Sequence, residues 1–289
     1  MASLRATALV AAALAVGLTA CAGEEGPPQP AAFTPSQVPA RGALVWAVGD
    51  GDSGSDSARL ARLIRRSDPD LFLYIGDVYE RGTAADFARR YAPTYGLLAR
   101  RTAPTPGNHD WPNADTGYRP YWKRARGRRI PNYYALKAGG WEILSLNSEA
   151  PHGALSAQVR WLRDRVRRPG TCRLAFWHRP RFSAGGSHGD QPDVAPLWRT
   201  LVGRARLILG GHEHASERFR RRDGITQFVA GAGGRSLYRL RSGDRRLAFG
   251  DARHHAALRL SLRPGAARFA FVTSSGRVLD RGSVRCRTR

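Results

Sequence analysis

Short apolar runs along the chain are each followed at once by polar residues of the kind that bind metals or phosphate. Five such junctions occur: Ala43 to Val48 before Gly49-Asp50-Gly51-Asp52, Leu71 to Ile75 before Gly76-Asp77-Val78-Tyr79, the stretch after Arg101 before Gly107-Asn108-His109-Asp110, Arg173 to Trp177 before His178-Arg179-Pro180, and Leu207 to Gly210 before Gly211-His212-Glu213-His214. A short apolar run bounded by turn residues is typical of a buried strand. The pattern therefore predicts buried strands that end in polar loops.

Helical spacing of apolar residues separates the first two of these runs. Leu60 and Ile64 recur at this spacing within 57–66, and further helices are predicted over 84–91 and 156–166. The order strand, helix, strand is typical of an open α/β sheet, in which parallel strands end at one edge and ligands bind there. We therefore expect the polar residues of the junctions to converge at one sheet edge.

A second sheet is predicted from the remaining strand-like segments. Tyr133 to Lys137 and Trp141 to Leu146 form a hairpin pattern over Ala138-Gly139-Gly140, and the arginine-rich tail over 257–284 is also strand-like. We expect this sheet to pack against the first. The sequence from Arg41 onward contains no second linker and no repeat, and its length suits one domain with a sizeable core.

The N-terminus has the pattern of an export signal. Arg5 precedes an unbroken small apolar run from Ala8 to Leu18, too short for a comfortable membrane span, which leads through Thr19-Ala20 into Cys21. This ending resembles the bacterial lipobox, so residues 1–20 are interpreted as a lipoprotein signal peptide and Cys21 as the acylated residue. The alternative is an ordinary secretory signal. We expect an exported protein, held on the outer side of the cell membrane by its lipid or secreted.

The next segment, 21–41, is rich in Pro, Ala and Gly and is predicted to be a flexible tether, with the catalytic domain following over 42–289. Cys172 and Cys286 are the other two cysteines. An even pair in an exported protein favours a disulfide that ties the C-terminus to the core. Two separate buried thiols are the alternative.

The chain is strongly basic, with a formal net charge of +24, and only Lys123 and Lys137 among its 47 basic residues are lysines. Guanidinium groups suit phosphate oxygens, so the surface favours anionic or phosphorylated substrates. No known nucleic-acid module is present, and no specific nucleic-acid partner is predicted. We expect a monomer.

Aromatic residues cluster after the third junction, next to a basic run over 123–129. They are Trp111, Tyr118, Tyr121 and Trp122. One interpretation is a stacking platform for nucleic-acid bases beside a basic groove. We favour a lid loop whose aromatic rings pack on the core.

The polar residues of the junctions form a mixed set of carboxylates, an amide and imidazoles. Such a set suits Mn, Fe or Zn, and no candidate ligand is a cysteine. A carboxylate such as that of Asp77 can bridge two cations, and two metals about 3.5–4 Å apart can clamp a phosphoryl group while lowering the pKa of a bound water.

In this order the junctions resemble the calcineurin-like metallophosphoesterases. That family has Asp-x-His or Asp-x-Gly, then Gly-Asp, Gly-Asn-His-Asp/Glu, a lone His after a strand, and Gly-His-x-His. All five blocks are present between Leu44 and Arg218, the first in altered form, and the spaced Gly-Asn-His-Asp and Gly-His-Glu-His blocks are highly specific. The surroundings of His178 and His212 look more like the purple acid phosphatase-related bacterial branch.

The resemblance implies a four-layer α/β/β/α sandwich of two mixed sheets with two metal ions, Fe, Mn or Zn. The implied ligands are Asp50, Asp77 and His214 for one ion, and Asp77, Asn108, His178 and His212 for the other. His109 is implied to be a transition-state donor or general acid, held by a carboxylate for which Asp110 is one candidate. Metal-bound hydroxide is implied to attack in line.

Two positions depart from the family pattern. Asp52 stands where many members have a histidine, and it could ligate, bind through water or only shape the loop. The purple acid phosphatase branch has Gly-Asp-x-x-Tyr with a ligating tyrosine, whereas Tyr79 comes one residue earlier in this chain. The sequence leaves open whether Tyr79 reaches the metal. It therefore also leaves open which metals are bound.

Three arginines near the ligands in sequence could bind phosphate oxygens: Arg179, Arg181 and Arg218. The histidines outside the motifs are expected to have surface or packing roles, and among them only His188, in the glycine-rich loop over 185–189, is a candidate for substrate contact.

The predicted function is hydrolysis of phosphoric esters, of acid-phosphatase-like monoesters first, with a phosphodiesterase or nuclease on the same site as the alternative. A catalytically silent polyanion-binding lipoprotein is the alternative of another class, and it would predict a broken ligand set.

Overall fold

The computed structural model describes residues 38–39, 41–168 and 171–286. The predicted signal peptide, Cys21 and the expected tether up to residue 37 lie outside these residues. Within the described end of the expected tether, Val38 packs against the core, and the Pro39 carbonyl accepts a 2.9 Å hydrogen bond from the backbone N–H of Gly139. Val38 and Pro39 are therefore part of the folded domain.

The first sheet contains the strands of the first three junctions. Its order is β13 (Val278–Arg285), β12 (Ala266–Thr273), β11 (Ala256–Arg263), β1 (Ala43–Val48), β2 (Leu71–Tyr74) and β3 (Thr102–Pro104). Strands β1, β2 and β3 are parallel, and β11 is antiparallel to β1. The sequence pattern predicted that the arginine-rich tail belongs to the second sheet. Instead, its strands extend the first sheet. Its backbone pairs with the open edge of β1.

The second sheet contains the predicted hairpin and the strands of the last two junctions. Its order is β10 (Leu247–Asp251), β8 (Ser216–Phe219), β9 (Thr226–Ala230), β7 (Leu207–Gly210), β6 (Arg173–Phe176), β5 (Trp141–Ser145) and β4 (Tyr134–Ala138). Strands β5, β6, β7 and β9 are parallel. The β4–β5 turn needs two glycines, because Gly139 and Gly140 both have positive φ, 58° and 82°.

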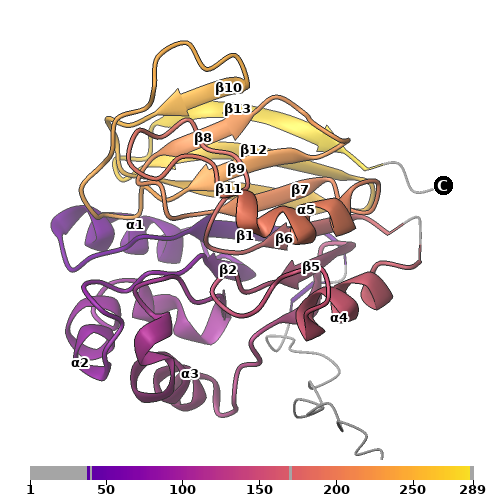
Figure 1. Cartoon of the computed structure of the whole chain (residues 1–289). Coiled ribbons are helices and arrows are strands. Elements are labelled where there is room, and N and C mark those ends of the chain that lie inside the picture. Colours follow the sequence, from indigo (N-terminus) through magenta and orange to yellow (C-terminus); the bar gives the residue numbers. More distant parts are fainter. Residues whose placement is uncertain (1–37, 40, 169–170, 287–289) are drawn as a thin grey trace, which may run out of the picture.

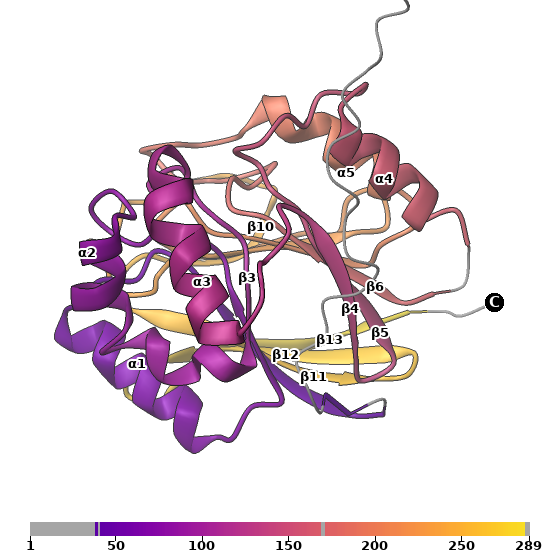
Figure 2. The same ribbon diagram turned by 90° about the horizontal axis from the view of Figure 1, so that it is seen from below.

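Helices cover the outer face of each sheet (Figures 1 and 2). On the first sheet lie α1 (Ser55–Arg66), α2 (Ala84–Asp86) continued by a π-helical turn (Phe87–Tyr91), a 3₁₀ helix (Tyr95–Arg101), two short turns (Trp111–Asn113 and Ala114–Tyr118) and α3 (Arg119–Arg126). On the second lie α4 (Ala157–Arg165), a 3₁₀ turn (Pro192–Val194) and α5 (Ala195–Leu201). Val159 and Leu162 of α4 and Leu197 of α5 pack with Leu144 and Ile208 of the sheet in one buried cluster. The predicted four-layer α/β/β/α sandwich is confirmed.

The aromatic cluster that follows the third junction packs inward. Tyr118 and Trp122 are buried, and the Tyr121 ring lies 4.7 Å from that of Phe87, measured between centroids. The predicted packing of these rings on the core is therefore confirmed, but the segment is helical and not the lid loop that we expected.

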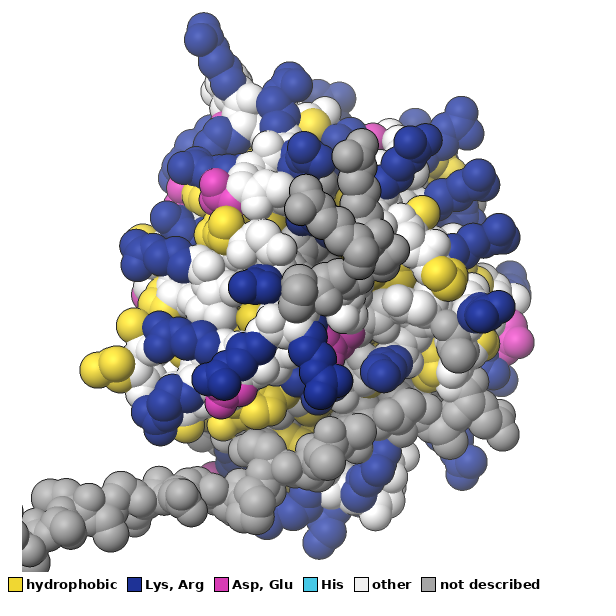
Figure 3. Space-filling view, turned by 90° about the vertical axis from the view of Figure 1, so that its right-hand side faces the viewer, with side chains coloured by type: hydrophobic (Ala, Val, Ile, Leu, Met, Phe, Trp, Pro, Cys, Tyr) yellow, Lys and Arg dark blue, Asp and Glu magenta, His cyan; other side chains and the backbone are white. Residues whose placement is uncertain are grey.

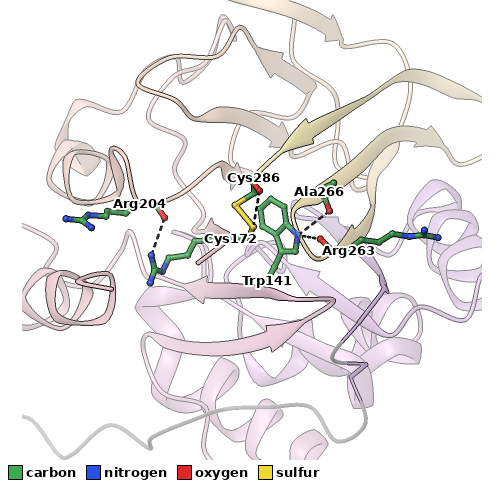
Figure 4. Close-up of a disulfide and its surroundings, with 7 residues drawn as sticks. Trp141, Cys172, Arg204, Arg263, Ala266 and Cys286 are labelled. Carbon is green, nitrogen blue, oxygen red and sulfur yellow. Dashed lines mark hydrogen bonds between the residues drawn. A yellow bond between two sulfur atoms is a disulfide. The ribbon is translucent and has the colours of Figure 1, made fainter. Parts of the chain in front are cut away.

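A disulfide links the two sheets at one end of the sandwich. Cys172, just before β6, is bonded to Cys286, just after β13, with a Cα–Cα distance of 5.6 Å. Trp141 lies beside this bond and donates through Nε1 to the carbonyls of Arg263 and Ala266 (Figure 4). The last strand of one sheet is thus covalently fixed to the other sheet. Among the described helices, none has both the length and the apolar character needed to cross a bilayer.

Candidate metal centre

The candidate site lies where the carboxyl ends of strands from both sheets meet. Asp50 follows β1 and accepts a 2.9 Å hydrogen bond through Oδ2 from the backbone N–H of His212, which follows β7. His178, which follows β6, contacts the Ile75 carbonyl at the end of β2 through Nδ1. The junctions therefore converge between two sheets and not at the edge of one, because the parallel strands of the stacked sheets end on the same side.

Three of the predicted ligands have left-handed backbone conformations. The φ angles are 60° for Asp50, 62° for Asp77 and 70° for His212. Such values are costly for residues with a Cβ atom, and they occur where surrounding structure enforces them, often at functional sites. Each residue comes within three positions of a strand end. The sharp turn aims its side chain into the space between the sheets.

One half of the site is built around His178. Its Nε2 lies 3.2 Å from Asp77 Oδ2 and 3.1 Å from Asn108 Oδ1, while its Nδ1 is 2.8 Å from the Ile75 carbonyl. A ring held through Nδ1 presents Nε2 to a metal. One ligand atom each of Asp77, His178 and His212 lies within 4.8 Å of the others, a spacing that fits one cation.

The other half is built around the hydroxyl of Tyr79. This oxygen lies 2.6 Å from His214 Nε2 and 3.3 Å from both Asp50 Oδ1 and Asp77 Oδ2. His214 is held from behind, because its Nδ1 lies 2.7 Å from the Ser236 carbonyl. Asp77 belongs to both halves, which is the position of a bridging ligand. Tyr79 reaches the cluster although it comes one residue earlier than in the related pattern.

The protonation of two of the imidazoles, those of His212 and His214, suits cations. Burial lowers the pKa of His212, and it lowers that of His214 to about 4, so both imidazoles are neutral at physiological pH and keep a free lone pair. Burial raises the pKa of Asp50, and the charge of Asp77 raises it further. Two buried carboxylates that share one hydroxyl are unfavourable together unless a cation compensates them. The donor set therefore fits metal ions.

Asp110 does not orient His109, contrary to the expectation. Its Oδ2 accepts hydrogen bonds of 2.8 and 2.9 Å from the backbone N–H groups of Asp77 and Gly107, and its Oδ1 accepts one of 2.9 Å from Val78. The carboxylate is drawn to these three donors because they bring its loop and that of Asp77 together. Burial, with the nearby charge of Asp77, raises the pKa of Asp110 to about 7.

His109 is oriented by a carbonyl instead. Its Nδ1 contacts the backbone oxygen of Glu80, and its Nε2 lies 3.9 Å from Asp77 Oδ2. The side chain is 35% exposed, whereas Asp77 is almost fully buried. His109 thus lies at the rim of the cluster with its ring open to solvent, where a substrate can reach it.

Asp52 lies apart from the ligand atoms. Its Oδ1 is 2.8 Å from the guanidinium of Arg90, and its Oδ2 is 3.1 Å from that of Arg235. Its Oδ1 also accepts a hydrogen bond from the Ser53 backbone. The expectation that Asp52 might ligate is therefore not supported by its contacts, which shape the loop.

Arg235 is a site residue that the motif analysis missed. Its backbone N–H donates to the Asp50 carbonyl at 3.0 Å, and its guanidinium lies 4.8 Å from the centroid of the Tyr79 ring and 2.6 Å from the Glu80 carboxylate. It connects the Asp50 loop to Tyr79. In a chain so rich in arginine, only the preceding Gly231-Ala232-Gly233-Gly234 could have drawn attention to it.

His188 stacks on a predicted ligand. Its ring is 4.0 Å from that of His212 between centroids, with an interplanar angle of 26°. The loop that carries it is held by Glu213, whose Oε2 accepts hydrogen bonds of 3.0 and 3.1 Å from the backbone N–H groups of His188 and Gly189. Gly185 packs so closely on Glu213 that a Cβ atom would lie 1.7 Å from its Cδ. Glu213 therefore fixes a loop beside the metal centre, a role that its place between two ligands did not reveal.

Tyr238 was also missed by the motif analysis. Its ring stacks on His214, with centroids 4.0 Å apart and an interplanar angle of 11°. Nothing in the sequence pattern around it distinguishes Tyr238 from a surface aromatic.

The three candidate substrate arginines have other partners. Arg179 Nε lies 3.0 Å from Glu149, and the Arg181 guanidinium lies 4.6 Å from the Phe182 ring centroid. Arg218 on β8 pairs with Asp280 of β13 at 2.7 Å. Arg218 is thus bound between the sheets by a carboxylate and not presented to the cluster, which corrects the expectation. Arg179 does affect a predicted ligand electrostatically, since it adds to the effect of burial in lowering the pKa of His212.

Comparison with known proteins gives two relatives of similar sequence. A probable purple acid phosphatase of Arabidopsis thaliana is 25% identical over 226 residues, which cover 68% of this chain and 51% of the relative. A probable cyclic nucleotide phosphodiesterase of Synechococcus is 28% identical over 180 residues, which cover 57% of this chain and 65% of that protein. The chain thus spans about half to two thirds of the length of these relatives.

A solved structure shares the fold. The purple acid phosphatase from yellow lupin (Lupinus luteus) seeds superimposes with a TM-score of 0.69 over 86% of this chain and 54% of that one, at 16% identity. The family model described as calcineurin-like phosphoesterase matches residues 47–216, which include every strand-end motif of the site. The chain therefore belongs to the calcineurin-like phosphoesterase family.

Proposed function

We propose that this protein is an exported phosphoric ester hydrolase that acts on phosphate monoesters, in the manner of an acid phosphatase, with two metal ions. The observation that carries the proposal is the shared position of Asp77. Its Oδ2 lies 3.2 Å from His178 in one half of the cluster and 3.3 Å from Tyr79 in the other.

The ligands would be divided by their contacts. Asn108, His178 and His212 would hold one ion, Asp50, Tyr79 and His214 the other, with Asp77 between them. When bound, such a pair neutralises phosphoryl oxygens and lowers the pKa of a coordinated water. Burial, together with the charges of Asp50 and Asp77, raises the pKa of Tyr79, so a strongly charged cation is needed to ionise it. This favours a trivalent ion such as ferric iron on the Tyr79 side, beside a divalent Fe, Mn or Zn.

The chain supplies the remaining groups from the rim of the site. His109 is solvent-accessible, and its Nε2 faces Asp77 from 3.9 Å. It can donate a hydrogen bond to a phosphoryl oxygen or a proton to the leaving alkoxide. His188, which is stacked on His212, can contact a phosphoryl group bound at the cluster.

The monoester preference rests on these two rim residues. His109 packs on the ring of Tyr79, with centroids 4.5 Å apart, and His188 packs on that of His212. We expect a phosphoryl group bound beside these rings to have more room for the one ester substituent of a monoester than for the two of a diester. Phosphodiesterase activity is the second candidate, because the Synechococcus relative is a probable cyclic nucleotide phosphodiesterase.

Two features support export. The N-terminal sequence has the signal pattern ending in Cys21, and Cys172 and Cys286 are disulfide-bonded, which is typical of an oxidising compartment. The complete set of ligand side chains argues against the silent polyanion-binding lipoprotein.

The test compares hydrolysis of a chromogenic phosphate monoester and its matching diester, before and after chelation. We expect the monoester to be cleaved faster and both activities to be lost with the metals. Asn108→Ala should lose at least 100-fold in kcat/KM, because a ligand is removed. His152→Ala, which removes a histidine paired with Asp193 outside the cluster, is the control and should remain active. Faster cleavage of the diester would favour a phosphodiesterase. No cleavage of either ester by the metal-loaded protein would favour the catalytically silent lipoprotein.

A further inference from the structure

An arginine-rich site, separate from the metal centre, lies at the opposite end of the sandwich. A hollow of about 410 Å³ between the two sheets is lined by Arg206, Arg218, Arg220, Arg221, Arg281 and Arg285, and none of the described residues that line it is acidic. An adjoining hollow of about 510 Å³ shares Arg206, Arg221 and Arg285 with the first. We call these two connected hollows the arginine groove.

The topology separates this groove from the ester site. Arg206 directly precedes β7, whereas His212 follows the end of the same strand. Arg285 ends β13, which runs antiparallel to β12 and therefore opposite to β1. The face on which β13 ends is rich in Lys and Arg side chains with few acidic ones (Figure 3).

Within the groove most of the charge is uncompensated. Arg218 is paired with Asp280. Among the described residues, none offers a carboxylate within 4.0 Å of the guanidinium groups of Arg206, Arg221, Arg281 or Arg285. Guanidinium groups gathered without counter-charges repel one another, and an anion with several oxygens would relieve this repulsion through charge-assisted hydrogen bonds.

The fold fixes the backbone that carries these groups. Arg281 and Arg285 lie four residues apart on β13, so their side chains point to the same face of the strand. The disulfide and the 2.8 Å hydrogen bond from the Cys286 N–H to the Gly265 carbonyl fix the end of this strand next to Arg285. Gly224, in the turn between β8 and β9, leaves open space beside Arg206, whose guanidinium would lie only 3.4 Å from a Cβ atom there.

The lining also indicates the kind of anion. Its aromatic residues, Phe219 and Phe269, are buried and cannot stack on nucleic-acid bases. None of the exposed large apolar residues of the described chain lines the groove, so it lacks the apolar anchor of a membrane-binding surface. We propose that the arginine groove binds soluble oligophosphates, anions in which several phosphate groups are linked in a short chain, at a site distinct from the metal centre.

The test is calorimetric titration of the purified protein with tripolyphosphate. The groove variant carries Arg206→Gln, Arg221→Gln and Arg285→Gln together. The control variant carries Arg62→Gln, Arg66→Gln and Arg89→Gln, which are exposed helical arginines, and it loses the same net charge. Both variants should hydrolyse the chromogenic ester like the parent protein, which shows that they fold and separates this test from that of the ester site.

We expect the groove variant to bind tripolyphosphate at least tenfold more weakly, and the control variant to stay within twofold of the parent. Equal weakening in both variants would show a diffuse effect of net charge and overturn the proposal, as would no weakening in the groove variant. Vesicles of phosphatidylglycerol form the second arm. If the parent binds vesicles through the groove arginines but does not bind tripolyphosphate, the site is a lipid-headgroup site and the proposal is wrong.

Discussion

The hydroxyl of Tyr79 lies 2.6 Å from Nε2 of His214, although the two residues are 135 positions apart in the chain. The ring of Tyr79 is packed between His109 and the guanidinium of Arg235, whose distances from it are 4.5 Å and 4.8 Å. These contacts direct the hydroxyl toward Asp50 and Asp77 from a loop one residue shorter than that of the related enzymes. The position of Tyr79 is thus maintained by its neighbours and not by motif spacing.

Replacing Tyr79 by Phe tests its role as a ligand. If the tyrosine binds a ferric ion, the parent protein has a visible charge-transfer absorption band, and Tyr79→Phe loses the band together with part of its bound metal. Absorption spectroscopy with elemental analysis checks both. Tyr133→Phe, whose ring packs on Trp161 away from the cluster, should keep band and metal. A band unchanged in Tyr79→Phe would show that the tyrosine is not a ligand.

Asp110→Asn should weaken both stability and catalysis. The carboxylate accepts three backbone hydrogen bonds, from Gly107, Asp77 and Val78, while an amide turns one acceptor into a donor. We expect a loss of about 1–3 kcal/mol in the free energy of unfolding, measured by urea denaturation. A tenfold or greater fall in kcat should accompany it, because Asp77 moves. The exposed Asp115→Asn should change neither quantity, and a similar result for Asp110→Asn would contradict a positioning role.

Glu213→Ala should affect substrate binding more than metal binding. It removes the acceptor for the backbone N–H groups of His188 and Gly189, so the loop that stacks His188 on His212 is released. We expect KM for a phosphate monoester to rise about tenfold, the cost of roughly one hydrogen-bonding contact, with the metal content unchanged. Loss of the metals in this variant would mean that Glu213 acts on the ligands themselves.

Glu217 should make folding stability depend on pH. Burial raises its pKa from 4.5 to about 7, although it accepts hydrogen bonds from Ala184 and Ser183. Below pH 4.5 the carboxyl is protonated in both the folded and the unfolded states. Between pH 4.5 and 7 the unfolded chain releases the proton first, so stability falls as pH rises and stays lower above pH 7, by roughly 3 kcal/mol.

Glu217→Gln is uncharged at every pH and should remove this component. The difference in melting temperature between the variant and the parent protein should therefore grow in favour of the variant from pH 4.5 to pH 7. A difference that stays constant over this interval would show that Glu217 does not titrate with a raised pKa.

The strand-end motifs were predictable because glycine turns and metal-binding side chains lie next to buried apolar runs. This local pattern identified Asp50, Asp77, Asn108 and His212 without any knowledge of their spatial neighbours. The assignment of strands to sheets could not be predicted in the same way. The pattern of β11 to β13 is compatible with either sheet, and pairing with β1 depends on contacts about 200 residues apart in sequence.

Residues whose role depends on tertiary contacts escaped the sequence analysis. Arg235 is one of many arginines, and only the folded chain brings it to Tyr79 and Asp52. Asp110 accepts hydrogen bonds from Asp77 and Val78, which lie in another loop. The sequence therefore showed a carboxylate next to His109, but not that this carboxylate faces away from the histidine. The sequence of helix α3 predicts a loop, because basic residues dominate it and hide the apolar spacing of a helix. Trp122 is its buried residue.

In the proposed centre Asp77 joins two metal ions, and this is tested most directly by measuring the metal content of the parent protein and of Asp77→Asn. Asp77 contacts both halves of the cluster, so we predict about two metal ions per chain in the parent and loss of both in the variant, with the fold kept. A parent protein that binds no metal after reconstitution, or an Asp77→Asn variant that retains two ions, would contradict the account.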